Sequence, residues 1–103
     1  MASYLFAYTG GSMAETDAER EAAMAAWGKW FGTLGSAIVD AGNPFGPSAS
    51  VGSGGAGGAA KSGLSGYSVL TADSLAAATE LAKACPVIAN GGAVDVYETI
   101  PVM

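Results

Sequence analysis

The stretch from Thr16 to Gly42 constrains the fold most, because it reads as one long amphipathic helix that carries both tryptophans. Thr16 and Glu19 have the spacing of a capping box, which favours a helix start at Thr16. Gly42 suits the left-handed position that ends a helix, and Asn43-Pro44 cannot continue one. With a helical period of 3.6, the apolar side chains share one stripe, namely Met24, Trp27, Trp30, Phe31, Leu34, Ile38 and Ala41. A helix of this kind needs a sheet or a second helix to cover its apolar stripe.

Three glycines form a second stripe on the same stretch: Gly28, Gly32 and Gly35. Each glycine inside a helix costs roughly 1 kcal/mol relative to alanine, so three on one side call for a reason. We favour a close approach of this side to the backbone of a neighbouring strand or helix. The alternative is that the glycines leave room beside Trp27 and Trp30 for a small ligand.

Composition narrows the function classes. The 103 residues suffice for a single domain, 1–103, with a modest core, and half of them are apolar. The net charge is −5 and the four cationic residues are scattered, so neither nucleic acid nor an anionic membrane surface is an expected partner. No signal segment and no bilayer-spanning stretch is visible, so we expect a cytoplasmic protein.

Histidine is absent, and Cys85 is the single cysteine. The chain therefore lacks the usual general base near neutral pH and the usual partner of a nucleophilic serine or cysteine. Without clustered carboxylates, we expect no metal site, and we expect no cofactor. Cys85 follows a predicted helix, where a thiol pKa rises, so we interpret it as a small buried apolar residue.

The remaining chain reads as four strands and a second helix. An aromatic run predicts the first strand, and Val51 anchors a short second strand. The low-complexity segment 52–63 is interpreted as a flexible glycine-rich hairpin tip; a phosphate-binding loop is the alternative, but Lys61-Ser62 follows Ala60 rather than glycine. The expected ranges are strands at 3–9, 48–53, 64–71 and 93–100, with a second helix at 74–84 capped by Asp73.

This order predicts an α+β, ferredoxin-like βαββαβ fold, with a four-stranded antiparallel sheet and two helices on one face. The other face would carry one parity of the first strand, either Tyr4, Phe6 and Tyr8 or Leu5 and Ala7. Either set is too apolar to be left in water, and a contiguous apolar patch marks an interface. We therefore expect a homodimer whose two sheets face each other across a shared cavity.

Several segments in this order resemble the YCII-related domain family, which includes the DGPF-type proteins. The matching segments are Tyr4-Leu5-Phe6-Ala7-Tyr8, Met24-Ala25-Ala26-Trp27-Gly28-Lys29-Trp30-Phe31, Asp40-Ala41-Gly42-Asn43-Pro44, Gly66-Tyr67-Ser68-Val69-Leu70, Asp73-Ser74-Leu75, Cys85-Pro86 and Val94-Asp95-Val96-Tyr97-Glu98. The resemblance covers most of the chain outside the glycine-rich tip. It implies a dimeric α+β barrel.

The resemblance implies less about activity. Some members resemble small lyases or isomerases related to muconolactone isomerase, with a histidine and an aspartate as the acid–base pair. This chain has no histidine, so that role has no residue to carry it. The Asp-Gly-Pro-Phe motif is also missing, and the nearest string, Asn43-Pro44-Phe45-Gly46, lies directly after the long predicted helix.

Three function classes remain open. The first is a small-molecule-binding barrel, with candidate ligand-binding residues Tyr8, Trp27, Asn43, Tyr67 and Tyr97. The second is a small lyase or isomerase with a carboxylate base, Glu98 or Asp40, and a tyrosine acid. Glu98 is the stronger candidate base, because apolar strand neighbours would raise its pKa. The third is an accessory protein-interaction module, which depends on the apolar sheet face alone.

Overall fold

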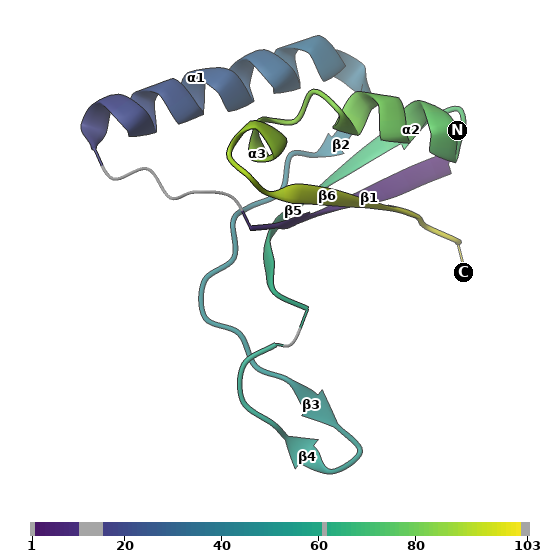
Figure 1. The fold of residues 1–103 in the computed structure, drawn as a ribbon. Coiled ribbons are helices and arrows are strands. Elements are labelled where there is room, and N and C mark those ends of the chain that lie inside the picture. Colours follow the sequence, from purple (N-terminus) through teal and green to yellow (C-terminus); the bar gives the residue numbers. More distant parts are fainter. Residues whose placement is uncertain (1, 11–15, 61, 102–103) are drawn as a thin grey trace.

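The computed structural model describes residues 2–10, 16–60 and 62–101. It is an α+β fold built on a four-stranded antiparallel sheet in the order β2-β5-β1-β6 (Figure 1). The sheet strands are β1 (Ala2–Thr9), β2 (Ile38–Asp40), β5 (Leu64–Ala72) and β6 (Ala93–Glu98). The helices are α1 (Asp17–Leu34), the short 3-10 turn η1 (Gly35–Ala37), α2 (Leu75–Ala82) and α3 (Pro86–Ala89). A separate hairpin pairs β3 (Val51–Gly52) with β4 (Gly55–Ala56).

The two halves of the chain interleave within the sheet. β5 lies between β1 and β2, and β1 lies between β5 and β6, so each helical crossover skips one strand. This split arrangement is compatible with the expected ferredoxin-like fold. Figure 1 shows the helices on one side of the sheet, while the β3–β4 hairpin extends away on the other side.

The strand register decides which parity of β1 faces the helices. Tyr4, Phe6 and Tyr8 are buried, and they belong to one cluster with Trp30 and Leu34 of α1 and with Ala78 and Ala82 of α2. Leu5 points to the opposite face, where it lies between Val69 of β5 and Tyr97 of β6. The face without helices therefore carries Leu5 and Ala7, one of the two alternatives that the sequence left open.

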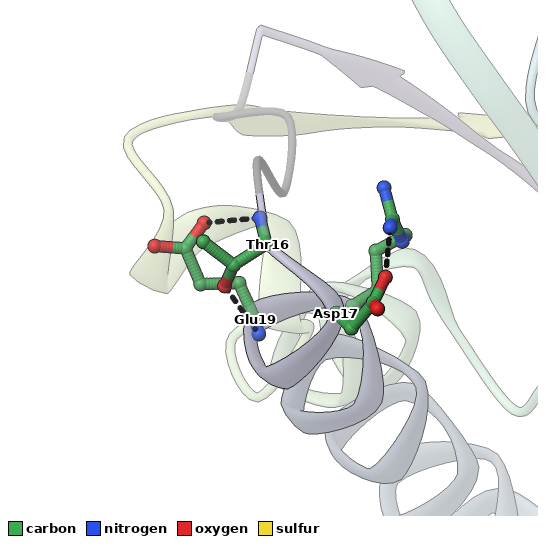
Figure 2. Close-up of polar contacts among 4 residues, drawn as sticks. Thr16, Asp17 and Glu19 are labelled. Carbon is green, nitrogen blue, oxygen red and sulfur yellow. Dashed lines mark hydrogen bonds and ion pairs between the residues drawn. The ribbon is translucent and has the colours of Figure 1, made fainter.

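Helix α1 begins as the sequence predicts. The Glu19 amide donates to Thr16 Oγ1 over 3.1 Å, and the Thr16 amide donates to Glu19 Oε2 over 3.4 Å, which completes the capping box (Figure 2). Arg20 pairs with Asp17 on the same turn. The capping box satisfies amides that the first helical turn leaves without partners.

The predicted end of this helix at Gly42 is wrong. α1 stops at Leu34, where Gly35 adopts a positive φ of 55° and its amide donates back to Phe31. Ile38–Asp40 then form β2, with Ile38 opposite Leu70 of β5. Ile38 and Ala41 continue the helical apolar spacing only by coincidence. The predicted strand at 48–53 is also wrong, because Val51 is 76% exposed and pairs only within the hairpin.

Gly42 does have the predicted left-handed conformation, with φ of 77°, but for another reason. It lies against β5, and a Cβ on Gly42 would stand 1.7 Å from the Tyr67 carbonyl oxygen. Only glycine has both the conformational freedom and the missing side chain that this crossing requires.

The expected close packing at the glycine stripe is contradicted. A Cβ built on Gly28 or Gly32 meets no atom within 4 Å, so no neighbouring backbone approaches them. Gly35 serves the helix end instead. α1 is thus held mainly by its large side chains, since only Trp30 and Leu34 of the helix are buried.

Two smaller details of the C-terminal half differ from the prediction. Ser74, not Asp73, caps α2, because its hydroxyl accepts from the Ala77 amide over 3.1 Å. Residues 86–89 form the short helix α3, which the sequence pattern did not predict, and Pro86 suits its first turn. Cys85 is buried as predicted, and burial raises the pKa of its thiol to about 11. Within the described part of the chain, no helix has the length and apolar content to cross a bilayer.

Candidate ligand-binding cavity

A cavity of about 580 Å³ lies between α1, the segment that follows β2, and neighbouring parts of β1 and β5. Tyr8, Trp27, Asn43 and Tyr67, which the sequence proposed as ligand-binding residues, all border it. The other lining residues are Ala23, Met24, Gly28, Phe31, Ala41, Gly42, Pro44, Ser65, Gly66, Ser68 and Val87. None of these residues is charged, so the described lining is apolar apart from hydroxyl, amide and backbone groups.

Aromatic rings form the wall that α1 contributes. The Trp27 ring meets Tyr8 edge-on, with ring centres 5.2 Å apart, and contacts Phe31 at 5.7 Å. Trp30 fixes this part of α1, because its indole Nε1–H donates to the Leu81 carbonyl over 3.1 Å. Edge-to-face pairs of this kind are specific in geometry, so Trp27 is held while it remains half-buried at the cavity.

The opposite wall is a crossing of two backbones. The Tyr67 amide donates to the Asn43 carbonyl over 3.3 Å, and the Phe45 amide donates to the Ser65 carbonyl over 2.9 Å. Gly66 permits this crossing, since a Cβ there would stand 3.1 Å from the Asn43 carbonyl oxygen. The glycine pair Gly42 and Gly66 thus brings residues 41–44 against β5 and closes this side of the cavity.

A hydroxyl relay lies at the inner end of the cavity. Tyr8 OH donates to Ser68 Oγ over 2.7 Å, and Ser68 Oγ donates to the Ala41 carbonyl over 2.7 Å. Ser68 is fully buried. Burial raises the pKa of Tyr8, so its hydroxyl keeps its proton at neutral pH. The relay therefore adds no charge to the cavity wall, and both of its hydroxyl protons are donated within the protein.

The other two tyrosines have different positions. Successive β5 side chains alternate, so the Tyr67 ring lies on the face opposite to Ser68, where its hydroxyl donates to Asp40 over 3.3 Å and its ring stacks on Phe45. Tyr67 is therefore among the lining residues while its ring lies on the sheet face away from α1. Tyr97 is 57% exposed on the sheet face without helices and does not line the cavity.

Each candidate base has a tyrosine partner, but neither carboxylate borders the cavity. Glu98 lies on the helix-covered face, opposite Tyr4, whose hydroxyl donates to Glu98 Oε1 over 3.1 Å. Burial, and then this hydrogen bond, raise the pKa of Tyr4, which makes it a weaker acid. Asp40 accepts from Tyr67 and from the Gly42 amide. Both carboxylates are exposed to solvent.

Sequence reasoning did not single out Ser68 or Phe31 as lining residues. Ser68 had a usable signal, because it is the one hydroxyl on the β5 face that also carries Leu70 and Ala72. Phe31 stood on the predicted apolar stripe, where core and ligand contacts look alike. Lys61, the residue of the phosphate-loop alternative, lies outside the described residues. Among the residues that the structure describes, no three metal-ligating side chains come together.

Comparison with known proteins adds no further assignment, since no family model, curated protein or solved structure matches this chain.

Proposed function

We propose that the protein binds a small, uncharged organic molecule with a flat apolar ring in the cavity beside Trp27. The observation that carries this proposal is the lining itself, where Trp27, Phe31 and Tyr8 gather without a charged neighbour in the described lining. A volume of about 580 Å³ lies in the range typical of small-molecule sites. The Trp27 indole would contact the ring of the ligand, and the exposed Asn43 amide would contact one polar group.

We also propose that the working form is a homodimer of the α+β barrel type, as in the YCII-related proteins that the sequence resembles. The support is the sheet face without helices, where Leu5 lies between Val69 and Tyr97. Asp40 and Asp95 stand on strands toward the two edges, which gives an apolar centre with a charged rim. Leu5→Lys should convert the dimer to a monomer in sedimentation at micromolar concentration. A wild-type chain that sediments as a monomer would contradict this part of the proposal.

A lyase or isomerase receives less support from the same geometry. A carboxylate acts as a base near neutral pH only when burial raises its pKa, whereas Glu98 and Asp40 are exposed. An accessory interaction role would use the same open sheet face as the dimer, so the sedimentation experiment addresses it as well.

The binding proposal is tested with a panel of neutral aromatic lactones and phenols, and with aromatic acids as charged counterparts. A ligand at 100 times its Kd should stabilise the fold by about 2.7 kcal/mol, which thermal melting detects. Neutral members should stabilise more than acids of the same ring size. If no member of the panel raises the melting temperature, the proposal loses its support.

Tryptophan fluorescence locates the binding site. Trp30→Phe leaves Trp27 as the reporter beside the cavity, and ligand should still quench its emission. Trp27→Phe leaves only Trp30, which is 4% exposed and packed in the core, and the quenching should largely disappear. Equal quenching in both variants would place the ligand elsewhere.

A further inference from the structure

A second hollow lies on the other side of α1, away from the crossing of residues 41–44. It is a groove of about 910 Å³ between α1 and the segment from Lys83 to Asn90. On α1, the residues that line it recur at helical spacing, as Ala22, Ala26, Trp30 and Thr33 do. Its α1 wall runs from Glu19 to Thr33, which spans about 21 Å at the rise of an α-helix.

The groove has an uneven charge distribution. Lys29 and Lys83 both border it, and they are two of the four cationic residues in a chain of net charge −5. The Trp30–Leu81 hydrogen bond joins their two elements, so both lysines stand near the same end of the groove. Between Glu19 and Lys29 the α1 wall consists of Ala22, Ala23 and Ala26, and Trp30 and Thr33 line the groove beyond Lys29.

The two ammonium groups are accessible to a ligand. Lys29 is exposed and takes part in neither of the ion pairs that the described chain contains. Lys83 pairs with Glu80 over 2.7 Å, but both side chains are about two-thirds exposed, at 66% and 69%. An ion pair at this exposure is weak, so an incoming carboxylate can compete for Lys83.

We infer that this groove binds a fatty carboxylate of medium chain length, with its head at Lys29 and Lys83 and its chain along the alanine wall. The distance along α1 from Lys29 back to Glu19 is about 15 Å, which suits an extended chain of this class. Cationic groups at one end and apolar side chains along most of the remaining wall, whose other polar members are Glu19, Thr33 and Asn90, match an anionic amphiphile. The neutral cavity beside Trp27 has no such cationic end, so the two hollows take different ligands.

The test compares decanoate with decyltrimethylammonium, which has the same chain and the opposite charge. The net negative charge of the protein favours the cation, whereas the groove favours the anion. By titration calorimetry at low salt, decanoate should bind on the order of tenfold tighter. In amide NMR spectra, decanoate should shift Ala26, Lys29 and Lys83 and leave Asn43 and Gly66 at the other cavity unchanged.

Variants distinguish binding in the groove from a general attraction between the anion and any cationic side chain. The double change Lys29→Gln and Lys83→Gln should weaken decanoate binding between about twofold and thirtyfold. Arg20→Gln removes a cation that does not border the groove, and the affinity should stay unchanged. Ala26→Phe should block the groove, while Ala25→Phe, at an exposed neighbour that borders neither hollow, should not.

Three results would overturn the inference. They are tighter binding of the cationic amphiphile, an equal effect of Arg20→Gln and the lysine changes, and spectral shifts centred on Asn43 and Gly66. Binding of the neutral aromatic panel beside Trp27 is measured in a separate experiment. A negative result at one site therefore does not decide whether the other site binds its ligand.

Discussion

Replacing Gly28 and Gly32 together by alanine should stabilise the protein. A Cβ at either position meets no atom within 4 Å, so the substitution creates no clash. Glycine inside a helix costs roughly 0.5–1 kcal/mol relative to alanine, because the unfolded chain loses more freedom. The double variant should therefore gain about 1–2 kcal/mol. In a domain of this size, that gain raises the melting temperature by roughly 4–16 °C.

Urea denaturation followed by circular dichroism measures the change, with Gly42→Ala as a control of opposite sign. A Cβ on Gly42 would overlap the Tyr67 carbonyl oxygen and would sit at a positive φ, so this variant should lose about 2–5 kcal/mol. A double variant at Gly28 and Gly32 that is less stable than the wild type would refute the reasoning. It would mean that backbone packs on this side of α1, as the sequence alone suggested.

Three further predictions follow from single contacts. Ser68→Ala should cost about 1–3 kcal/mol in urea titrations, because Tyr8 OH and the Ala41 carbonyl both lose their partner, and an unchanged midpoint would rule out the relay. Thr16→Ala should lower stability by about 0.5–2 kcal/mol in thermal melts through loss of the cap, with Thr33→Ala outside the cap as the comparison. Burial raises the pKa of the Cys85 thiol to about 11 in the folded protein, against 9.0 for an unperturbed thiol. The stability that this shift contributes is fully present below pH 9, and the free energy of unfolding falls by about 2–3 kcal/mol as the pH rises to 11. The Cys85→Ala variant should show a smaller fall between about pH 8 and 11.

The sequence predicted correctly those elements whose apolar residues or capping residues form a clear local pattern. The aromatic alternation of β1, the apolar run of β5 and the capping box at Thr16 and Glu19 all lie where the pattern placed them. The ligand candidates Tyr8, Trp27, Asn43 and Tyr67 all border one cavity, although Asn43 belongs to the segment after β2, whose course the pattern did not predict. The cavity between them was not itself predictable, since it depends on how α1 sits above the sheet.

The prediction was wrong where the apolar residues of a short element happen to continue the spacing of the element before it. Ile38 falls on the helical apolar stripe, and a three-residue strand is too short to show an alternation of its own. Gly35 ends the helix, but a glycine inside an amphipathic pattern does not by itself indicate a helix end. The exposed hairpin at Val51 then took the place of β2 in the predicted sheet, because its single valine resembled a strand anchor.

The crossing at Gly42 and Gly66 also separates two parts of the chain that should differ in how well they tolerate changes of sequence and length. On one side of it lie the sheet and the cavity, and on the other lies the β3–β4 hairpin (Figure 1). The entropy of closing a loop grows only with the logarithm of its length, by about 0.6 kcal/mol per doubling. We therefore expect the hairpin to tolerate changes of length, whereas a Cβ on Gly42 would overlap the Tyr67 carbonyl oxygen and a Cβ on Gly66 would stand only 3.1 Å from the Asn43 carbonyl oxygen.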